Sequence, residues 1–538
     1  MLRAAALGAG GLLVAAVQPV PVAQAGAGPD CAERENASYA RLLECVSPEG
    51  VLAQLAAFQQ IADDSTDPVY PGSRAAGTEG YAAGVDLVAG QLREAGYEVT
   101  LDPVEIAFAH PAVLTQLTPI PGDRATGPFT GSGSARVEGR VVPVDVALAG
   151  DRASTSACEP ADFAGLDLTG PADIALVQRG ACSFGLKAQN AQDAGAEAVV
   201  VFNQGNAGAG PGDDRLGLIV GDATSLDLEG TRPTDLRVPV VGTSFADGEL
   251  LAVPGATAVV EARIETRTDV SVLAELPGRN RDNVVMAGAH LDSVPAGPGI
   301  NDDGSGAAAL LETALMMART QPENSLRFAW WAGEELGLVG STDYVTGLSP
   351  AELDRIALYL NYDMVGSPNG LFLVYDADES SFPALETVAV PPGSAAIEDL
   401  YESWYTLVGL PYDDTSFDGR SDYDAFIRAG IPSGGLFTGA EGTKTDAQAA
   451  LWGGTAGEAF DPCYHQACDT MANLDEHALD VDSDLIAFSM LTFAYSTEAV
   501  NGVPGREVCG GPVDLPAPAG PEGTFVTADG GAAGRLSV

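Results

Sequence analysis

Two histidines and four carboxylates in the second half of the chain have the residue types and the surroundings of metal ligands. Each follows an apolar run or a glycine-rich turn, where the backbone could hold the side chain in place. Alone each motif is a weak signal, because an isolated histidine is usually structural and paired glutamates usually face solvent. Together they form one set: His290, Asp302, Glu334, Glu335, Asp363 and His465.

The chemistry of this set predicts zinc. Imidazole nitrogens and carboxylates suit Zn²⁺, whereas Mg²⁺ and Ca²⁺ prefer sites made only of oxygen. Two nitrogen ligands, two carboxylates and one bridging carboxylate are enough for a pair of zinc ions. One further carboxylate is then left to act as a general base toward water.

Two neighbouring side chains could support the set. Asp292 lies two residues after His290 and could hydrogen-bond the second ring nitrogen, which would fix the tautomer. Tyr464 directly precedes His465 and places a phenol beside it. A disulfide between the flanking Cys463 and Cys468 would stiffen the loop that presents both side chains.

The elements that must position these residues alternate between strand and helix over residues 266–500. Buried strands are predicted at 283–289, 326–331 and 356–361, and a helix with one apolar face at 304–319. Alternation of this kind predicts an α/β fold with a mixed, mostly parallel sheet and helices on both faces. The motifs follow the carboxyl ends of the strands, where ligands bind in such sheets.

The rest of the chain divides by composition. Arg3, the apolar run after it and the Ala23-Gln24-Ala25 site predict a secretory signal peptide. A stretch rich in Gly, Pro and short strands predicts a β-rich insert, and the C-terminal stretch reads as a flexible tail. The predicted divisions are a signal peptide at 1–25, the first part of the catalytic domain at 26–110, the insert at 111–265, the second catalytic part at 266–502, and a Gly/Pro/Ala-rich tail at 503–538.

Composition excludes several classes of protein. The 538 residues carry a net charge of −49, which repels nucleic acid and anionic membrane surfaces. Apolar residues make up 46% of the chain, too many for an intrinsically disordered protein. After the N-terminal run, no segment reaches 18 apolar residues, so we expect a secreted, extracellular protein that does not enter the membrane.

Seven cysteines in an exported chain predict disulfides. Besides the Cys463–Cys468 pair, Cys158 and Cys182 flank one module of the insert. Three cysteines remain, so one is left over if these two pairs form: Cys31, Cys45 and Cys509.

At the metal-ligand motifs the sequence resembles the secreted bacterial leucyl aminopeptidases, zinc exopeptidases with two co-catalytic metals whose family includes aminopeptidase Y. The resemblance implies the zinc exopeptidase fold. It implies that His290 and Asp363 bind one zinc ion, that Glu335 and His465 bind the other, and that Asp302 bridges them.

The same resemblance implies roles for the supporting residues. Glu334 matches the general base, Asp292 a carboxylate that supports the site, and Tyr464 the phenol that assists the oxyanion. Arg420 is expected near the substrate's amino end. Phe437 is expected in the wall of an apolar pocket that favours Leu-, Phe- or Met-like first residues.

Two further features come with the resemblance. Some relatives hold a structural calcium ion, for which Asp480 and Asp484 could be ligands, whereas Cys45 stands where an N-terminal acidic ligand would align. The insert resembles a protease-associated (PA) domain through the segment 176–184 and the one at 191–196. A monomer is the expected state.

The sequence therefore predicts a secreted zinc aminopeptidase that releases large apolar residues from the N-termini of peptides. A carboxypeptidase of the same superfamily would need a basic patch for the terminal carboxylate, and only Arg420 and Arg428 lie near the predicted pocket. A glutaminyl cyclase of this fold typically uses one zinc ion. A non-catalytic, receptor-like binding protein would have lost metal ligands, whereas this chain retains the full set.

Overall fold

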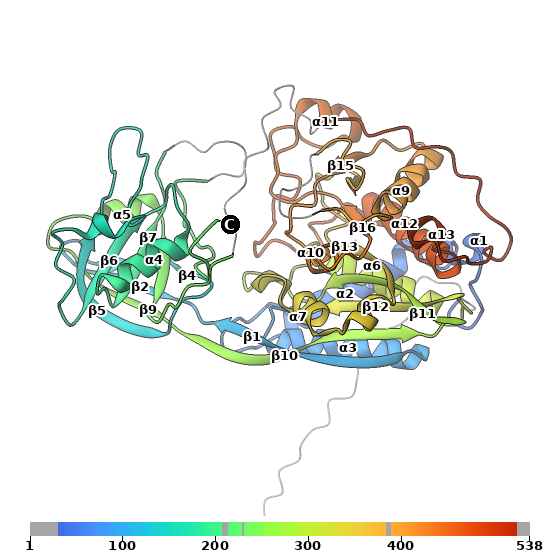
Figure 1. Ribbon diagram of the computed structural model, residues 1–538, viewed down its shortest axis with the longest axis horizontal. Helices are drawn as coiled ribbons and strands as arrows, with labels where there is room; N and C mark the ends of the chain where they lie inside the picture. The colour runs from blue at the N-terminus through green and yellow to red at the C-terminus, as the bar shows by residue number, and fades with distance from the viewer. Residues whose placement is uncertain (1–30, 207–213, 229–230, 383–388, 525–538) are drawn as a thin grey trace, which may run out of the picture.

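The computed structural model describes residues 31–206, 214–228, 231–382 and 389–524. The signal peptide predicted at 1–25 lies outside these residues. The described chain forms two bodies, each built on its own eight-stranded sheet (Figure 1). The larger body holds every residue of the predicted metal site.

The sheet of the larger body is mixed. Its strands lie in the order β1 (Glu98–Ala109), β10 (Ile264–Leu276), β12 (Asn324–Trp331), β11 (Asn280–His290), β13 (Ile356–Tyr362), β16 (Ser433–Phe437), β14 (Leu373–Tyr375) and β15 (Asp413–Thr415). The central pairs β12–β11, β11–β13 and β13–β16 are parallel, and the pairs β1–β10, β10–β12 and β16–β14 are antiparallel. The predicted mixed α/β class is confirmed.

Helices cover both faces of this sheet, which is why its central strands are almost entirely apolar. Along β11, Val285 and Ala287 pack into the core on one face, and Met286 packs on the other. The first face carries α3 (Glu79–Ala95), α6 (Gly304–Met317), α9 (Ser394–Val408) and α12 (Glu476–Tyr495), with α2 (Pro48–Asp64) against α6. The second face carries α7 (Val339–Gly347) and α10 (Tyr423–Arg428). Shorter helices complete the body: α1 (Tyr39–Leu43), α8 (Pro350–Leu353), α11 (Asp446–Trp452), α13 (Glu498–Asn501) and the 3₁₀ turn η2 (Glu334–Leu336).

The second body is an insertion between β1 and β10. Its sheet runs in the order β3 (Gly122–Asp123), β2 (Val113–Thr118), β9 (Thr257–Ala262), β5 (Ala135–Pro143), β6 (Asp173–Gln178), β7 (Ala198–Phe202), β8 (Val240–Thr243) and β4 (Gly127–Pro128). It also holds α4 (Phe184–Asp193), α5 (Phe245–Leu251) and a 3₁₀ turn, η1 (Pro160–Phe163). The long antiparallel pair β1–β10 joins the two bodies, as Figure 1 shows. The predicted β-rich insert is confirmed.

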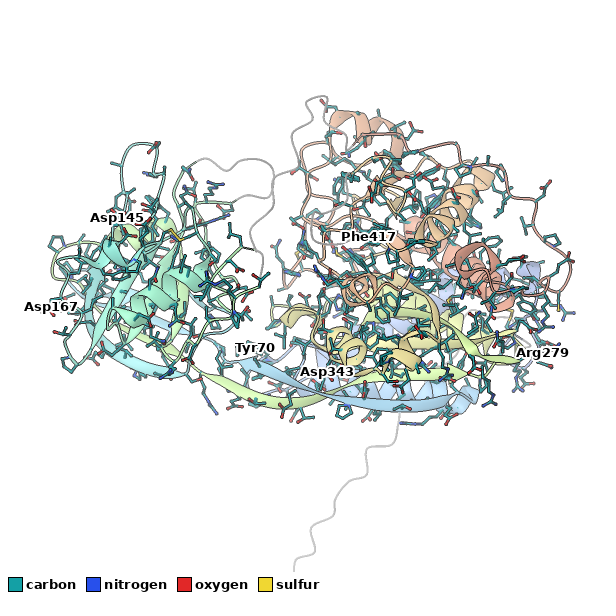
Figure 2. All side chains as sticks on the ribbon, in the orientation of Figure 1. Tyr70, Asp145, Asp167, Arg279, Asp343 and Phe417 are labelled. Carbon is teal, nitrogen blue, oxygen red and sulfur yellow. A yellow bond between two sulfur atoms is a disulfide. The ribbon has the colours of Figure 1, made fainter. Side chains whose placement is uncertain are left out.

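Side chains at the junction tie this strand pair to the larger body. The Tyr70 hydroxyl donates a hydrogen bond of 2.6 Å to the carbonyl of Ala109, the last residue of β1. In Figure 2 Tyr70 lies beside the junction. The segment between α2 and α3, which carries Tyr70, is thus hydrogen-bonded to the end of β1 at the junction. The same segment carries Arg74, which is buried in the larger body.

The disulfides agree with the predicted pairs. Cys158 is bonded to Cys182 and Cys463 to Cys468. A third bond joins the remaining pair Cys31–Cys45, and Cys509 is a free, exposed thiol. Across the described ranges, no helix has the length and apolarity needed to cross a membrane.

The C-terminal stretch differs from the predicted flexible tail as far as Thr524. Val508 is buried against the larger body. The Gly520 N–H donates to the Tyr412 hydroxyl, and the Thr524 N–H donates to the Asp413 carboxylate; both donor–acceptor distances are 2.8 Å. A segment rich in Gly and Pro can thus be ordered by its backbone hydrogen bonds, which composition alone does not reveal.

Candidate metal centre

Three neighbouring parallel strands bring the predicted ligands to one edge of the sheet. Strand β11 ends at His290, β12 ends just before the turn that carries Glu334 and Glu335, and β13 ends just before Asp363. Because β11 is parallel to both neighbours, these three ends meet. The loop between β11 and α6 adds Asp302, and the disulfide-closed loop adds His465.

Asp302 stands between two groups of potential ligand atoms. One of its oxygens lies 3.1 Å from Nε2 of His290, which is itself 3.6 Å from a carboxylate oxygen of Asp363. Its other oxygen lies 3.1 Å from Nε2 of His465, which is 3.0 Å from Glu335. The five predicted ligands are therefore brought together as two triads that share Asp302, with the ligand atoms of each triad within 4.8 Å of one another.

The electrostatics of the site favour bound cations. Burial and the charge of Asp302 raise the pKa of Glu335 to about 7, against the opposing effect of His465. One oxygen of Glu335 is buried and has no hydrogen-bond partner among the described residues. A buried carboxylate oxygen without a partner is costly, and a divalent ion would both pair with it and offset the repulsion between the carboxylates. The nitrogen and oxygen atoms present suit zinc.

Asp292 supports the site in a different way from the one predicted. The proton on Nδ1 of His290 is donated to the backbone carbonyl of Asp292 over 2.9 Å, which leaves Nε2 free to act as a ligand. The Asp292 carboxylate is 3.7 Å from that ring nitrogen. It instead accepts the backbone N–H groups of Glu334 and Glu335, at 3.2 and 3.4 Å, and so holds the turn that carries both glutamates.

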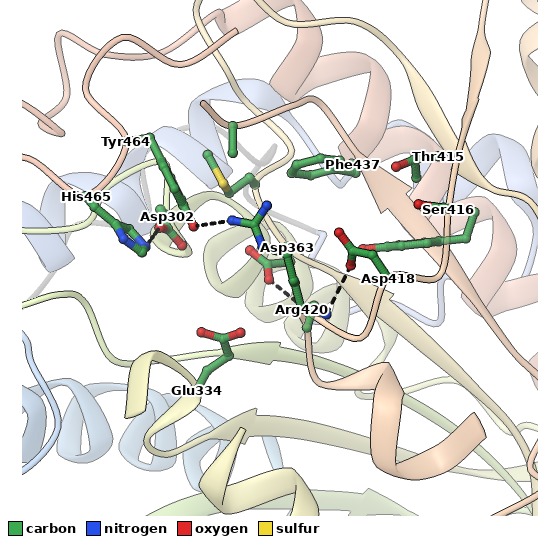
Figure 3. Close-up of a pocket in the computed structure, with 14 residues that line it drawn as sticks. Asp302, Glu334, Asp363, Thr415, Ser416, Asp418, Arg420, Phe437, Tyr464 and His465 are labelled. Carbon is green, nitrogen blue, oxygen red and sulfur yellow. Dashed lines mark hydrogen bonds and ion pairs between the residues drawn. The ribbon is translucent and has the colours of Figure 1, made fainter. Parts of the chain in front are cut away.

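The Glu334 carboxylate faces the same space as Asp302, Asp363 and His465, as Figure 3 shows. One of its oxygens lies 3.9 Å from Nε2 of His290. Burial raises the pKa of Glu334 well above its usual range; His290 opposes this shift, and Glu335 and Asp363 add to it. A carboxylate with raised proton affinity at this place is suited to accept a proton and to return it.

A pocket opens on these residues and extends toward Phe437. Arg420 lies in its wall and donates to Glu441 over 2.9 Å and to the Tyr464 hydroxyl over 3.2 Å. Tyr464 in turn stacks on the ring of His465. The lining residues include Asp302, Glu334, Asp363, Met364, Tyr375, Thr415, Asp418, Arg420, Phe437, Tyr464 and His465.

Sequence reasoning missed two residues that hold the ligand loops together. Asp303 accepts the backbone N–H groups of His290 and Met364, each at 3.1 Å, and it caps α6 by accepting from Gly306. Ser421 donates to Asp363 over 2.5 Å. Asp303 stands directly before a helical run, which is an N-cap signal in the sequence. Its hydrogen bonds with His290 and Met364 join distant segments, and no short stretch of sequence predicts them.

Removing the Cys463–Cys468 bond should impair turnover more than stability. The bond closes a loop of only a few residues, so it constrains the unfolded chain weakly. That loop carries Tyr464 and His465, and we expect kcat to fall about 10-fold in the double serine variant. The same replacement at Cys158 and Cys182, in the inserted body, is the control and should leave kcat unchanged. Equal losses in both variants would contradict this role of the loop.

A second group of acidic side chains lies beside the pocket. Asp376, Glu398 and Asp414 each offer an oxygen within 4.8 Å of the other two. The calcium ligands predicted from the sequence are elsewhere: Asp480 and Asp484 lie on α12, and their role stays a prediction. The position of the expected N-terminal ligand is held by Cys45, which is bonded to Cys31.

The acidic group of Asp376, Glu398 and Asp414 should make the folded protein less stable as the pH rises. Burial, together with the charges of the surrounding carboxylates, raises the pKa of Glu398 from 4.5 to about 9. The folded state therefore keeps a proton that the unfolded state has released. The stabilisation is complete below pH 4.5 and is lost as the pH rises toward 9. In metal-free buffer the Tm should fall over this range, and Glu398→Gln should reduce the fall. An unchanged pH profile in that variant, with the exposed Glu352→Gln as control, would contradict the assignment.

Comparison with known proteins follows the same division into two bodies. Residues 271–490 match the model of "Peptidase family M28", and residues 137–251 match the PA domain. The chain is 43% identical over 471 residues to an aminopeptidase of Pseudomonas aeruginosa strain UCBPP-PA14, covering 86% of this chain and 83% of that protein. The chain belongs to peptidase family M28. Its inserted body is a PA domain.

Other M28 relatives and solved structures agree. The chain is 40% identical over 465 residues to the probable lipoprotein aminopeptidase LpqL of Mycobacterium tuberculosis, covering 85% and 87% of the two chains. An aminopeptidase from Aneurinibacillus sp. strain AM-1 superposes with a TM-score of 0.58 at 26% identity, over 86% of this chain and 97% of that one. BSAP, a zinc aminopeptidase from Bacillus subtilis, has the same fold, with a TM-score of 0.62 at 22% identity over 85% and 97%.

Proposed function

We propose that this M28 peptidase is a secreted zinc aminopeptidase that removes large apolar residues from the N-termini of peptides. The observation that carries the proposal is the pair of triads that share Asp302 beside the buried carboxylate of Glu334. The relatives named as aminopeptidases support the reaction class. The three disulfides suit an oxidising, extracellular location.

We propose two zinc ions per chain. His290 and Asp363 would hold one, Glu335 and His465 the other, and Asp302 would contribute to both. Zinc ions at this place supply Lewis acidity, which activates water and stabilises developing negative charge.

The protein's own groups then provide positioning and proton transfer. Glu334 takes a proton from the attacking water and delivers it to the departing amine. The Tyr464 hydroxyl donates to the oxyanion that forms on the scissile carbonyl. Asp418, a carboxylate in the pocket lining that is not a proposed ligand, favours a substrate's free ammonium group.

Arg420 favours an aminopeptidase over a carboxypeptidase. Its guanidinium already donates to Glu441 and to Tyr464. A carboxypeptidase needs a cation free to receive the terminal carboxylate of its substrate. Arg420 is instead placed to orient the Tyr464 phenol.

Phe437 should set the preference for the first residue of the substrate. Phe437→Ala removes apolar surface from the pocket wall, so kcat/KM for leucine p-nitroanilide should fall about 10-fold. The value for alanine p-nitroanilide should change little, because a methyl side chain reaches less of that wall. Leu407→Ala, at an exposed position on α9, is the control. Equal losses on both substrates would contradict a role in specificity.

A further inference from the structure

Arg74 is a fully buried cation that sequence reasoning did not single out. It lies in the segment between α2 and α3, and its side chain has no solvent exposure. All three guanidinium nitrogens donate to backbone carbonyls of one loop. Nη1 donates to Leu291 over 2.5 Å, Nε to Pro298 over 2.9 Å, and Nη2 to Gly299 over 2.5 Å.

That loop connects two of the proposed metal ligands. It leaves β11 directly after His290 and reaches Asp302 just before α6. The guanidinium therefore holds the loop at its first residue and again close to its end. Among the described residues no other side chain donates to these three carbonyls, and one backbone group, the Gly304 N–H, donates to Gly299 at 3.1 Å.

The backbone of Arg74 holds the middle of the same loop. The Arg74 N–H donates to Oγ of Ser293 at 3.0 Å, and the Ser293 N–H donates to the Arg74 carbonyl at 3.3 Å. Ser293 Oγ in turn donates to the carbonyl of Gly297 over 3.0 Å. The loop is thus fixed at its start, middle and end by one residue from a distant part of the chain.

The charge of Arg74 also fits its place. Burial lowers the pKa of Arg74 to about 10, so it stays protonated at neutral pH; Asp469 and Asp292 are the carboxylates that most oppose this shift. Asp469 accepts the backbone N–H groups of Asn301 and Asp302, at 2.8 and 3.0 Å. Arg74 therefore places one positive charge behind a site crowded with carboxylates.

We propose that Arg74 is a positioning residue of the metal centre, which fixes the loop between His290 and Asp302 so that both side chains keep the spacing that the metal ions require. This inference rests on the proposed function. Lysine should replace it poorly, because one ammonium nitrogen cannot reproduce the planar fork that meets the three carbonyls from three separate nitrogens. Without the fork, the carbonyls of Leu291 and Pro298 lose their donor, whereas Gly299 keeps the Gly304 N–H, and the loop shifts to find others.

The test measures metal binding apart from activity. The purified Arg74→Lys variant is loaded with zinc and titrated with a chromophoric chelator, and its cobalt-substituted form is examined by visible absorption. We expect zinc affinity about 10- to 100-fold below that of the wild type, an altered cobalt spectrum, and a kcat that falls while KM changes little. Tyr70→Phe, in the same segment, removes only the hydroxyl that donates to Ala109 at the junction; it is the matched control and should behave as wild type.

Ser293→Ala keeps the test decisive if Arg74→Lys does not fold. It removes the hydroxyl that joins Arg74 to the middle of the loop, so it should lower zinc affinity in the same direction by a smaller factor. A folded Arg74→Lys variant with wild-type zinc affinity and cobalt spectrum would overturn the inference. So would unchanged zinc affinity in Ser293→Ala if Arg74→Lys is unfolded. Failure of the wild type itself to bind zinc would instead count against the proposed function.

Discussion

Replacing Glu334 with glutamine should lower kcat about 10³-fold while the metal content stays unchanged. Glutamine has nearly the same shape but cannot accept a proton, and positioned acid–base groups contribute about 10²- to 10⁴-fold to rate. The Glu334 side chain faces both triads without belonging to the set of proposed ligands. Steady-state hydrolysis of leucine p-nitroanilide, with zinc counted by mass spectrometry on the same sample, measures both quantities.

The control for this variant is Glu94→Gln, at an exposed position on α3. It makes the same chemical change far from the site and should retain wild-type kcat. A Glu334→Gln enzyme that folds, holds its zinc and keeps most of its turnover would show that another group moves the proton.

Replacing Asp302 with alanine should remove both metal ions. Asp302 is the one carboxylate shared by the two triads, with one oxygen 3.1 Å from each histidine. Because a metal ion supplies several kcal/mol of transition-state stabilisation, we expect kcat/KM to fall by at least about 10³-fold. The zinc count should fall toward zero, whereas His465→Ala should retain about one ion, since the triad of His290, Asp302 and Asp363 stays complete.

Two controls separate loss of a metal ligand from unfolding and from a general effect of removing a carboxylate. Circular dichroism would show whether the Asp302→Ala chain is folded. Asp282→Ala, at a side chain that is 91% exposed, should keep both zinc ions and full activity. Retention of two zinc ions in folded Asp302→Ala would contradict the shared role of this carboxylate.

The sequence predicted that the candidate ligands lie together because, although each motif alone is a weak signal, most of them stand at or near the end of a recognisable strand. His290 ends an apolar strand, Asp363 directly follows one, and Glu335 lies in the turn after one; such strands are recognised from short runs of residues. Parallel pairing then brings the strand ends to one edge, so a fold class was enough to predict that the motifs meet. The prediction of export favoured disulfides; the Cys463–Cys468 pair followed from close spacing, and the Cys158–Cys182 pair from their places on either side of one module.

What the sequence could not predict depends on contacts between distant segments. The fork of Arg74 contacts a loop more than 200 positions away in the chain, with sequence separations of 217 to 225. The Asp292 carboxylate accepts backbone N–H groups rather than the imidazole N–H, because Nδ1 of His290 already donates to the backbone carbonyl of Asp292. The order of residues 503–524 arises from hydrogen bonds to Tyr412 and Asp413, which no composition rule anticipates.

The most direct test of the proposed function compares two substrates of the purified mature protein. Leucine p-nitroanilide has a free amino group, and its N-acetylated form does not. Each is assayed before chelation, after chelation, and after zinc is added back. We predict cleavage of the free-amine substrate only, lost on chelation and restored by zinc. Cleavage of the acetylated substrate at a similar rate, or activity that survives complete zinc removal, would contradict a zinc aminopeptidase.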